Sequence, residues 1–111
     1  METFSELKKP VRSDRIRSIP RSFSWIDRDL LHRRILQRLR RDEIAVYFFL
    51  VLTAGPEGTS FWSYGRMAKL LKLSEDEVLS AVQGLIRHDL IAFRHPTFQV
   101  LSLPEPAHGR P

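Results

Sequence analysis

The chain has 111 residues, 42% of them hydrophobic, with 18 Lys and Arg against 13 Asp and Glu, which allows one small domain with tails. The absence of cysteine excludes disulfides and thiolate-bound metal ions and is typical of a reducing compartment. No apolar run reaches the roughly 20 residues that span a membrane, and the first residues are too charged for an export signal, so we expect a cytoplasmic protein without a membrane partner.

The basic residues are concentrated in the N-terminal third of the chain. Residues 1–41 hold 12 Lys and Arg against 5 Asp and Glu, whereas residues 42–111 hold 6 against 8. Residues 1–22 contain two prolines and no sustained hydrophobic period, which predicts a disordered basic arm in front of a domain at 23–103 and a tail at 104–111. We expect a polyanionic partner to be held mainly by this basic third.

Two helices are predicted after the arm. The segment "FSWIDRDLLHRRILQRL" repeats Leu and Ile at helical spacing, which predicts a first helix over residues 27–38. The apolar run "IAVYFFLVLTA" is too long for an ordinary strand and follows two acids, which predicts a second helix over residues 41–54 that ends at Gly55 and Pro56. Because the second helix is apolar nearly all round, we expect it to be the central buried helix.

A short strand and a second pair of helices follow. The segment "TSFW" predicts a brief strand at residues 59–62, and Ser63 is expected to cap a third helix through "YGRMAKLLK". After a connection of three residues, Ser74 and Glu77 form a capping box for a fourth helix that runs to about Arg87. The segments "LIAFR" and "FQVLSL" then predict two strands around a tight turn at "HPT".

The order of these elements is helix, helix, short strand, helix, turn, helix, strand, strand. With the helix pair "SYGRMAKLL" and "SEDEVLSAVQGLI" and the strands "LIAFR" and "FQVL", the sequence resembles the winged helix-turn-helix superfamily over about residues 25–103. The phrase "LIRHDLIAF" is similar to the join between recognition helix and wing in bacterial regulators and replication initiators, and to small winged-helix proteins encoded beside mobile elements. The resemblance implies a mainly α fold with a small β-hairpin wing. It also implies double-stranded DNA as the partner of a transcription regulator or an accessory factor of replication or transposition.

The fourth helix opens with three acids, Glu75, Asp76 and Glu77, although the partner implied by the resemblance is a polyanion. Acids in a first turn interact favourably with the helix dipole, and Glu77 closes the capping box, so a structural role accounts for them. Three carboxylates at this position would nevertheless meet phosphates unfavourably. The buried side of the helix is expected to consist of Val78, Leu79, Ala81, Val82, Leu85 and Ile86.

The residues expected to contact DNA come from the arm and from every predicted helix of the domain except the apolar one, together with the wing tip. On the outer face of the fourth helix, Gln suits an adenine edge and Arg suits guanine or phosphate. Five arginines crowd the first helix and its end, and the two acids nearest to them cannot neutralise all five. The expected DNA-binding residues are Arg12, Arg15, Arg17, Arg21, Arg33, Arg34, Arg40, Lys69, Lys72, Ser80, Gln83, Arg87, Arg94 and His95.

A homodimer is also expected, because an ordered part of about 80 residues rarely supplies a sufficient core alone. Four apolar residues without an obvious place in so small a core, namely Phe23, Trp25, Leu30 and Leu36, are the expected dimerisation residues. The alternative is that Phe23 and Trp25 fold back onto the wing strands and complete the monomer.

No feature of the sequence indicates an enzyme. The four histidines lack metal-ligand spacing, "GPEG" is a turn and no phosphate-binding loop, and no nucleophile motif is present, so we expect no catalytic residue, metal, cofactor or small-molecule ligand. The alternative function is a winged-helix module that docks onto a protein, through the acidic helix face or the segment "FSW", without binding DNA.

Overall fold

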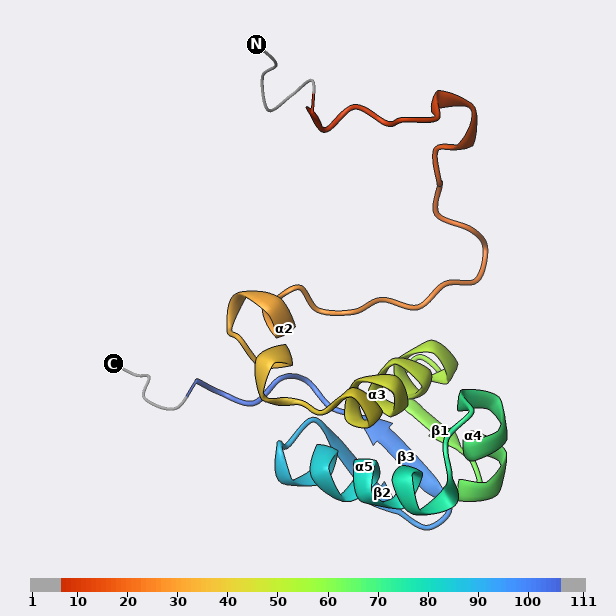
Figure 1. The fold of residues 1–111 in the computed structure, drawn as a ribbon, viewed down its shortest axis with the longest axis vertical. Coiled ribbons are helices and arrows are strands. Elements are labelled where there is room, and N and C mark those ends of the chain that lie inside the picture. The colour runs from red at the N-terminus through yellow and green to blue at the C-terminus, as the bar shows by residue number, and fades with distance from the viewer. Residues whose placement is uncertain (1–6, 107–111) are drawn as a thin grey trace.

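The computed structural model describes residues 7–106, in which a short basic arm leads into a small domain of helices and one sheet (Figure 1). The elements in chain order are η1 (Ser13–Arg15), α2 (Asp29–His32), η2 (Leu36–Arg38), α3 (Arg41–Thr53), β1 (Thr59–Phe61), α4 (Tyr64–Leu71), α5 (Glu75–Arg87), β2 (Ile91–Arg94) and β3 (Thr97–Val100). This is the order predicted for a mainly α fold with a β-hairpin wing.

The predicted first helix over residues 27–38 is wrong as a continuous element. The chain makes one α-helical turn at α2, leaves the helix at Arg34, whose φ of 62° is in the left-handed region, and resumes in the 3-10 turn η2. In an unbroken helix Leu30 and Ile35 would point about 140° apart. The break lets both side chains enter the core, where 3% of Leu30 and 6% of Ile35 is exposed.

Helix α3 confirms the predicted second helix to within one residue at its C-terminal end. Glu43 closes its first turn, because its Oε1 accepts a hydrogen bond from the Arg40 backbone N–H at 2.8 Å. This helix packs at the centre of the domain, as expected of the central buried helix, but it is buried on one side only. Helices α4 and α5 and strand β3 cover only one side of it, so Val46 and Leu50 are fully buried while Phe48 is 57% exposed.

Helices α4 and α5 are capped as the sequence predicts. Ser63 Oγ accepts a hydrogen bond from the Arg66 N–H at 3.1 Å and so caps α4. Ser74 Oγ accepts from the Glu77 N–H at 3.0 Å, and Glu77 Oε1 accepts from the Ser74 N–H at 2.9 Å, which is the predicted capping box.

The three strands form one antiparallel sheet in the order β1-β3-β2. Strand β3 is central, with Ser60 opposite Phe98 on one side and Phe93 opposite Phe98 on the other. Gly58 leads into β1 with a φ of 84°, and a Cβ there would lie 2.7 Å from the Val100 carbonyl oxygen, so only glycine fits this close approach. Strands β2 and β3 with the turn at His95 and Pro96 form the wing.

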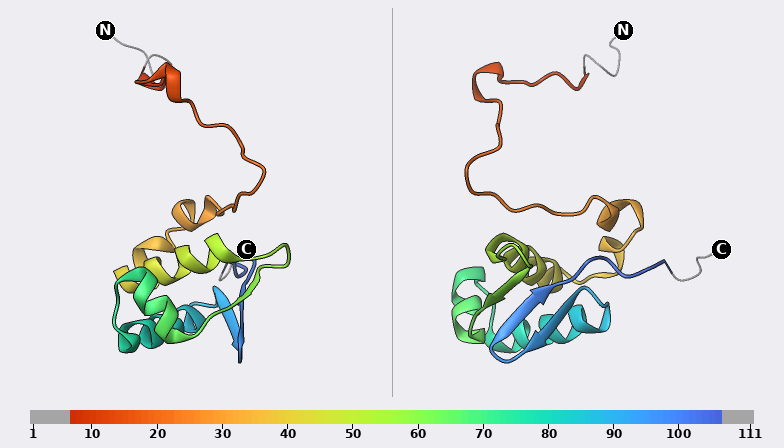
Figure 2. Two further views of the ribbon diagram at one scale, coloured as in Figure 1. Left: turned by 90° about the vertical axis from the view of Figure 1, so that its right-hand side faces the viewer. Right: turned by 180° about the vertical axis from the view of Figure 1, so that it is seen from behind.

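The core lies between α3, α5, α4 and the sheet. Its fully buried side chains are Phe98, Leu50, Met67, Leu85, Leu90, Ile91, Val46, Val78 and Val82. The arm does not contribute to it, since residues 7–22 are all exposed. In every view the arm leaves from the side of α2 and α3, at the end of the domain opposite to α5 and the wing tip (Figure 2).

Candidate nucleic-acid interface

Helices α4 and α5 form a tight helix-turn-helix. The turn consists of Lys72, Leu73 and Ser74, and Lys72 adopts the left-handed conformation with a φ of 59°. The Leu73 N–H donates to the Ala68 carbonyl at 3.0 Å, and its half-buried side chain packs against the core. The turn is therefore fixed at both ends, and α5 is held rigidly against the rest of the domain.

Helix α5 presents one polar face to solvent. Its buried side holds Val78, Ala81, Val82 and Leu85, as predicted from the helical spacing. Two flanking residues assigned to that side, Leu79 and Ile86, are instead 39% and 43% exposed, because neither α3 nor the sheet reaches around to them. The outward face carries Asp76, Gln83 and Arg87, which are all exposed.

The three acids at the start of α5 do not all face outward. Glu77 is engaged in the capping box with Ser74. The carboxylate of Glu75 turns back toward α4, where its Oε2 lies 3.2 Å from the place that a Cβ on Gly65 would occupy. Asp76 is the acid on the outward face next to Gln83, while Glu75 and Glu77 are exposed at the same helix end but engaged with α4 and the capping box.

Arg40 joins the start of α3 to the middle of α5, a role that the sequence reasoning missed. Its Nη2 donates to Ser80 Oγ at 2.9 Å, and its Nε pairs with Asp42 Oδ1 at 3.1 Å. Its Nη2 also lies 3.4 Å from Glu43 Oε2, and Glu43 is only 2% exposed. The hydrogen bond with Asp42 raises the pKa of Arg40 further above its ordinary value, so this residue is charged at any physiological pH.

Two residues of this network, Arg40 and Ser80, are among the predicted DNA contacts. In the structure their side chains are hydrogen-bonded to each other within the domain, and their contact with DNA stays a prediction. The sequence held a signal only for the local contact between Arg40 and Glu43, because Glu43 stands three residues after Arg40 at a helix start, the spacing of a capping box. Close packing is required here as well, since a Cβ on Gly84 would lie 1.8 Å from Glu43 Oε2.

A third residue predicted to contact DNA, Arg33, is also engaged within the domain. Its half-buried side chain donates from Nη2 to the Pro104 carbonyl and so ties the segment after β3 to the turn after α2. The neighbouring Arg34 is exposed and remains available.

The structure brings together some of the remaining predicted DNA residues and separates others. Helix α5, the α4–α5 turn and the wing tip lie at one end of the domain, and Lys69, Lys72, Arg94 and His95 are exposed there (Figures 1 and 2). The arm residues Arg12, Arg15, Arg17 and Arg21 are exposed at the opposite end. Arg12 is additionally paired with Asp14 at 2.7 Å.

The predicted dimerisation residues fall into two groups. Leu30 is a core residue at 3% exposure and Leu36 packs partly against the core, which corrects the expectation that Leu30 is available to a partner. Phe23 and Trp25 are 61% and 75% exposed. Their segment is fixed by one hydrogen bond, from Ser24 Oγ to the Leu52 carbonyl at 3.0 Å.

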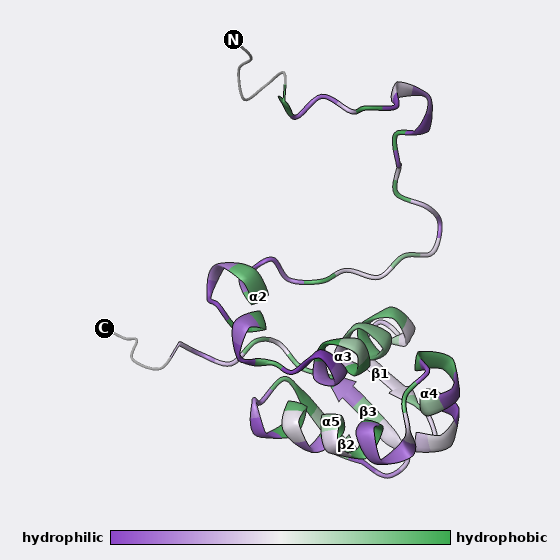
Figure 3. Cartoon of the chain, viewed as in Figure 1, coloured by the Kyte–Doolittle hydropathy of each residue, from purple (hydrophilic) through white to green (hydrophobic). Residues whose placement is uncertain are grey.

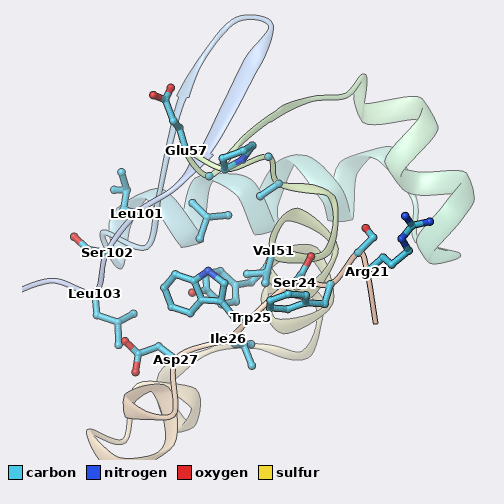
Figure 4. Close-up of a pocket in the computed structure, with 18 residues that line it drawn as sticks. Arg21, Ser24, Trp25, Ile26, Asp27, Val51, Glu57, Leu101, Ser102 and Leu103 are labelled. Carbon is cyan, nitrogen blue, oxygen red and sulfur yellow. The ribbon is translucent and has the colours of Figure 1, made fainter. Parts of the chain in front are cut away.

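The Phe23–Trp25 segment borders an open cavity of about 600 Å³ between the C-terminal end of α3, the α3–β1 loop and the residues after β3 (Figure 4). Trp25 stands over this cavity (Figure 4), which Tyr47 and Val51 also line. The alternative that Phe23 and Trp25 fold back and complete the monomer is therefore only partly correct. The segment does return to the end of β3, but both aromatic rings stay largely exposed.

Residues 7–106 contain neither a metal-binding cluster nor a membrane-spanning helix. No group of three or more His, Cys, Asp and Glu side chains in this range is arranged to hold a metal ion. No helix in this range is long and apolar enough to cross a membrane.

Comparison with known proteins agrees with this geometry. Residues 37–91 match the family model of a helix-turn-helix domain, a range that begins within η2 and covers α3, β1, α4, α5 and the first residue of β2. No curated protein and no solved structure matches the chain. Helix-turn-helix domains of this kind bind DNA. With the hairpin that follows the matched range, residues 37–100 have the arrangement of a winged helix-turn-helix domain.

Proposed function

We propose that the protein binds duplex DNA with α5 in the major groove, as a transcription regulator or an accessory factor of replication or transposition. The observation that carries this proposal is the outward face of α5. Gln83 and Arg87 are exposed there, and within residues 7–106 neither forms a side-chain hydrogen bond or an ion pair. Gln and Arg are the side chains that suit adenine and guanine edges.

The cations around α5 would then hold the phosphate backbone. Lys69 and Lys72 belong to the helix that precedes the recognition helix and to the turn after it, the position from which such motifs contact the backbone. Arg94 and His95 are exposed at the wing tip, and in this proposal they contact the adjacent groove. These contacts position the protein, whereas Gln83 and Arg87 supply the sequence preference.

The basic arm supports affinity from a greater distance. It leaves the domain on the far side from α5, so its cations cannot lie beside that helix without a change in the path of the arm. Fifteen extended residues span up to about 50 Å, which is enough to pass around a small domain. We infer that the arm contacts phosphates flanking the site read by α5.

The experiment that tests the proposal is the binding of fluorescently labelled random-sequence duplex to the full chain across a salt series. We expect binding at low salt that weakens linearly in log K against log salt. The double variant Gln83→Ala, Arg87→Ala should bind about tenfold to a hundredfold more weakly to a selected site. The matched control Gln37→Ala, Arg28→Ala changes an exposed Gln and an exposed Arg near α2, and should bind as wild type does.

The second candidate function is docking onto another protein without DNA binding. It is favoured by one observation, the exposed apolar side of α3, which includes Phe48 at 57% exposure. Absence of DNA binding by wild type at low salt would support this candidate and refute the first.

A further inference from the structure

The side of α3 that points away from the core carries an exposed apolar stripe. Ile44, Phe48 and Leu52 recur every four residues on this side and are 38%, 57% and 56% exposed. Figure 3 shows α3 coloured as apolar beyond its first turn, although only one side of it is covered. A small protein rarely leaves such a contiguous apolar stripe in water unless another surface covers it.

The stripe is extended by the segment before α2. The hydrogen bond from Ser24 to the Leu52 carbonyl places Phe23 and Trp25 at the C-terminal end of the stripe. These two rings are 61% and 75% exposed. Taking about 150–250 Å² for each aromatic side chain, the stripe and the two rings expose on the order of 500 Å² of apolar area. Two such patches facing each other reach roughly 1,000 Å², the lower bound for a specific interface.

We propose that this face, defined as Ile44, Phe48, Leu52, Phe23 and Trp25, binds a second copy of the chain, with the two α3 helices antiparallel about a two-fold axis at Phe48. A two-fold pair of helices that cross at Phe48 brings Phe48 against its own copy. Ile44 of each copy then meets Leu52 of the other, because these two residues lie equally far from Phe48 along the helix. The apolar stripe is thus complementary to itself in this arrangement.

Charge at the ends of α3 favours the same antiparallel pairing. Arg41 is exposed in the first turn of α3, where a cation opposes the positive end of the helix dipole. In the antiparallel pair it faces the C-terminal end of the other α3, where the dipole is negative. The exposed carboxylate of Glu57 follows two residues after Gly55 at that end, and it points away from the cavity (Figure 4). A parallel pair would instead place the two Arg41 side chains together.

The dimer would also set the spacing of the two α5 helices on DNA, an inference that rests on the proposed DNA-binding function. Gly84 of α5 faces Glu43 of α3, and Gln83 is about 100° further round α5, roughly a quarter turn away from the direction of α3. If the two-fold axis is parallel to the direction in which Gln83 points, the outward faces of both α5 helices lie on the same side of the dimer. Three interhelical steps of about 8–10 Å separate the two α5 axes by roughly 24–30 Å, close to the spacing of about 34 Å for half-sites one turn apart.

Disulfide trapping tests the interface, because the native chain has no cysteine and each variant carries a single thiol. Under mild oxidation at tens of micromolar, we expect Phe48→Cys to form a covalent dimer at least about tenfold faster than Phe61→Cys. Phe61 is the matched control, since it is 72% exposed but lies on β1. Equal rates for the two variants would overturn the proposal.

The register is tested by mixing two variants. Ile44→Cys mixed with Leu52→Cys should form the heterodimer faster than either forms a homodimer, and a preference for the two homodimers would overturn the antiparallel pairing. Sedimentation should show that the wild type and the control Phe61→Glu are dimers, whereas Phe48→Glu is a monomer. A wild-type protein that is monomeric at tens of micromolar would also overturn the proposal. Monomeric Phe48→Glu should keep weak binding to random duplex, so a failure of DNA binding is separable from a failure of dimerisation.

Discussion

Replacement of Gly84 by alanine places a methyl group where α3 and α5 touch. The new carbon would lie 1.8 Å from Oε2 and 2.8 Å from Cδ of Glu43, so the Glu43 side chain must leave its position. It then loses the hydrogen bond from the Arg40 N–H and the contact with Arg40 Nη2, while its buried surroundings offer no water. Hydrogen bonds to a buried charge contribute about 1.5–3 kcal/mol, and the capping interaction adds about 1 kcal/mol.

The helix propensity of alanine acts in the opposite direction. Alanine is about 1 kcal/mol more favourable than glycine in a helix interior, so the net expectation for Gly84→Ala is a destabilisation of about 1–3 kcal/mol. Urea unfolding followed by circular dichroism measures this difference as a shift of the midpoint. Gly55→Ala is the matched control, because its Cβ would meet its nearest neighbour, the Thr59 carbonyl oxygen, at an ordinary 3.7 Å, and its effect should stay below about 0.5 kcal/mol.

A double-mutant cycle identifies Glu43 as the obstacle. In a Glu43→Ala background the methyl group meets no carboxylate, so Gly84→Ala should be neutral or stabilising by up to about 1 kcal/mol. The coupling between the two positions should therefore be about 1–4 kcal/mol. The packing argument would be refuted by a Gly84→Ala protein as stable as wild type, or by the same loss of stability in both backgrounds.

Three further predictions concern DNA affinity and pH. Deletion of residues 1–22 removes six cations. The slope of log K against log salt should become shallower by roughly 0.9 for each of them that contacts a phosphate. An unchanged slope would exclude a role of the arm in DNA binding. Asp76→Asn should change the unfolding free energy by less than about 1 kcal/mol and strengthen binding to random duplex, and unchanged binding would show that α5 does not face DNA. Burial, and secondarily Asp27, raises the pKa of Tyr47 above its ordinary 10.0, so the folded state keeps the phenol proton more tightly and stability falls as the pH rises above about 10. Tyr47→Phe should flatten this part of a urea-unfolding profile, and an equal flattening by Tyr64→Phe would contradict the assignment.

The sequence by itself determined the elements whose signals are local. The capping box of Ser74 and Glu77, the Ser63 cap and the stop at Gly55 and Pro56 depend on residues within one turn of each other, and the structure has the corresponding helix ends at those places. The same holds for the order of elements, which was sufficient to predict a winged helix-turn-helix. The buried side of α5 also followed from its spacing, apart from its two flanking residues.

Only the tertiary structure decided which of these surfaces remain free. The break at Arg34 depends on the need to bury both Leu30 and Ile35 in one core, a requirement that no local pattern expresses. The apolar composition of α3 could not reveal that a single layer of partners covers it and leaves Phe48 exposed. Arg40 and Ser80 are 40 residues apart in the chain, so their hydrogen bond exists only because α3 and α5 pack together at Gly84. Local sequence sets where a helix begins and ends, whereas the identity of its neighbours depends on contacts between residues that are distant in the chain.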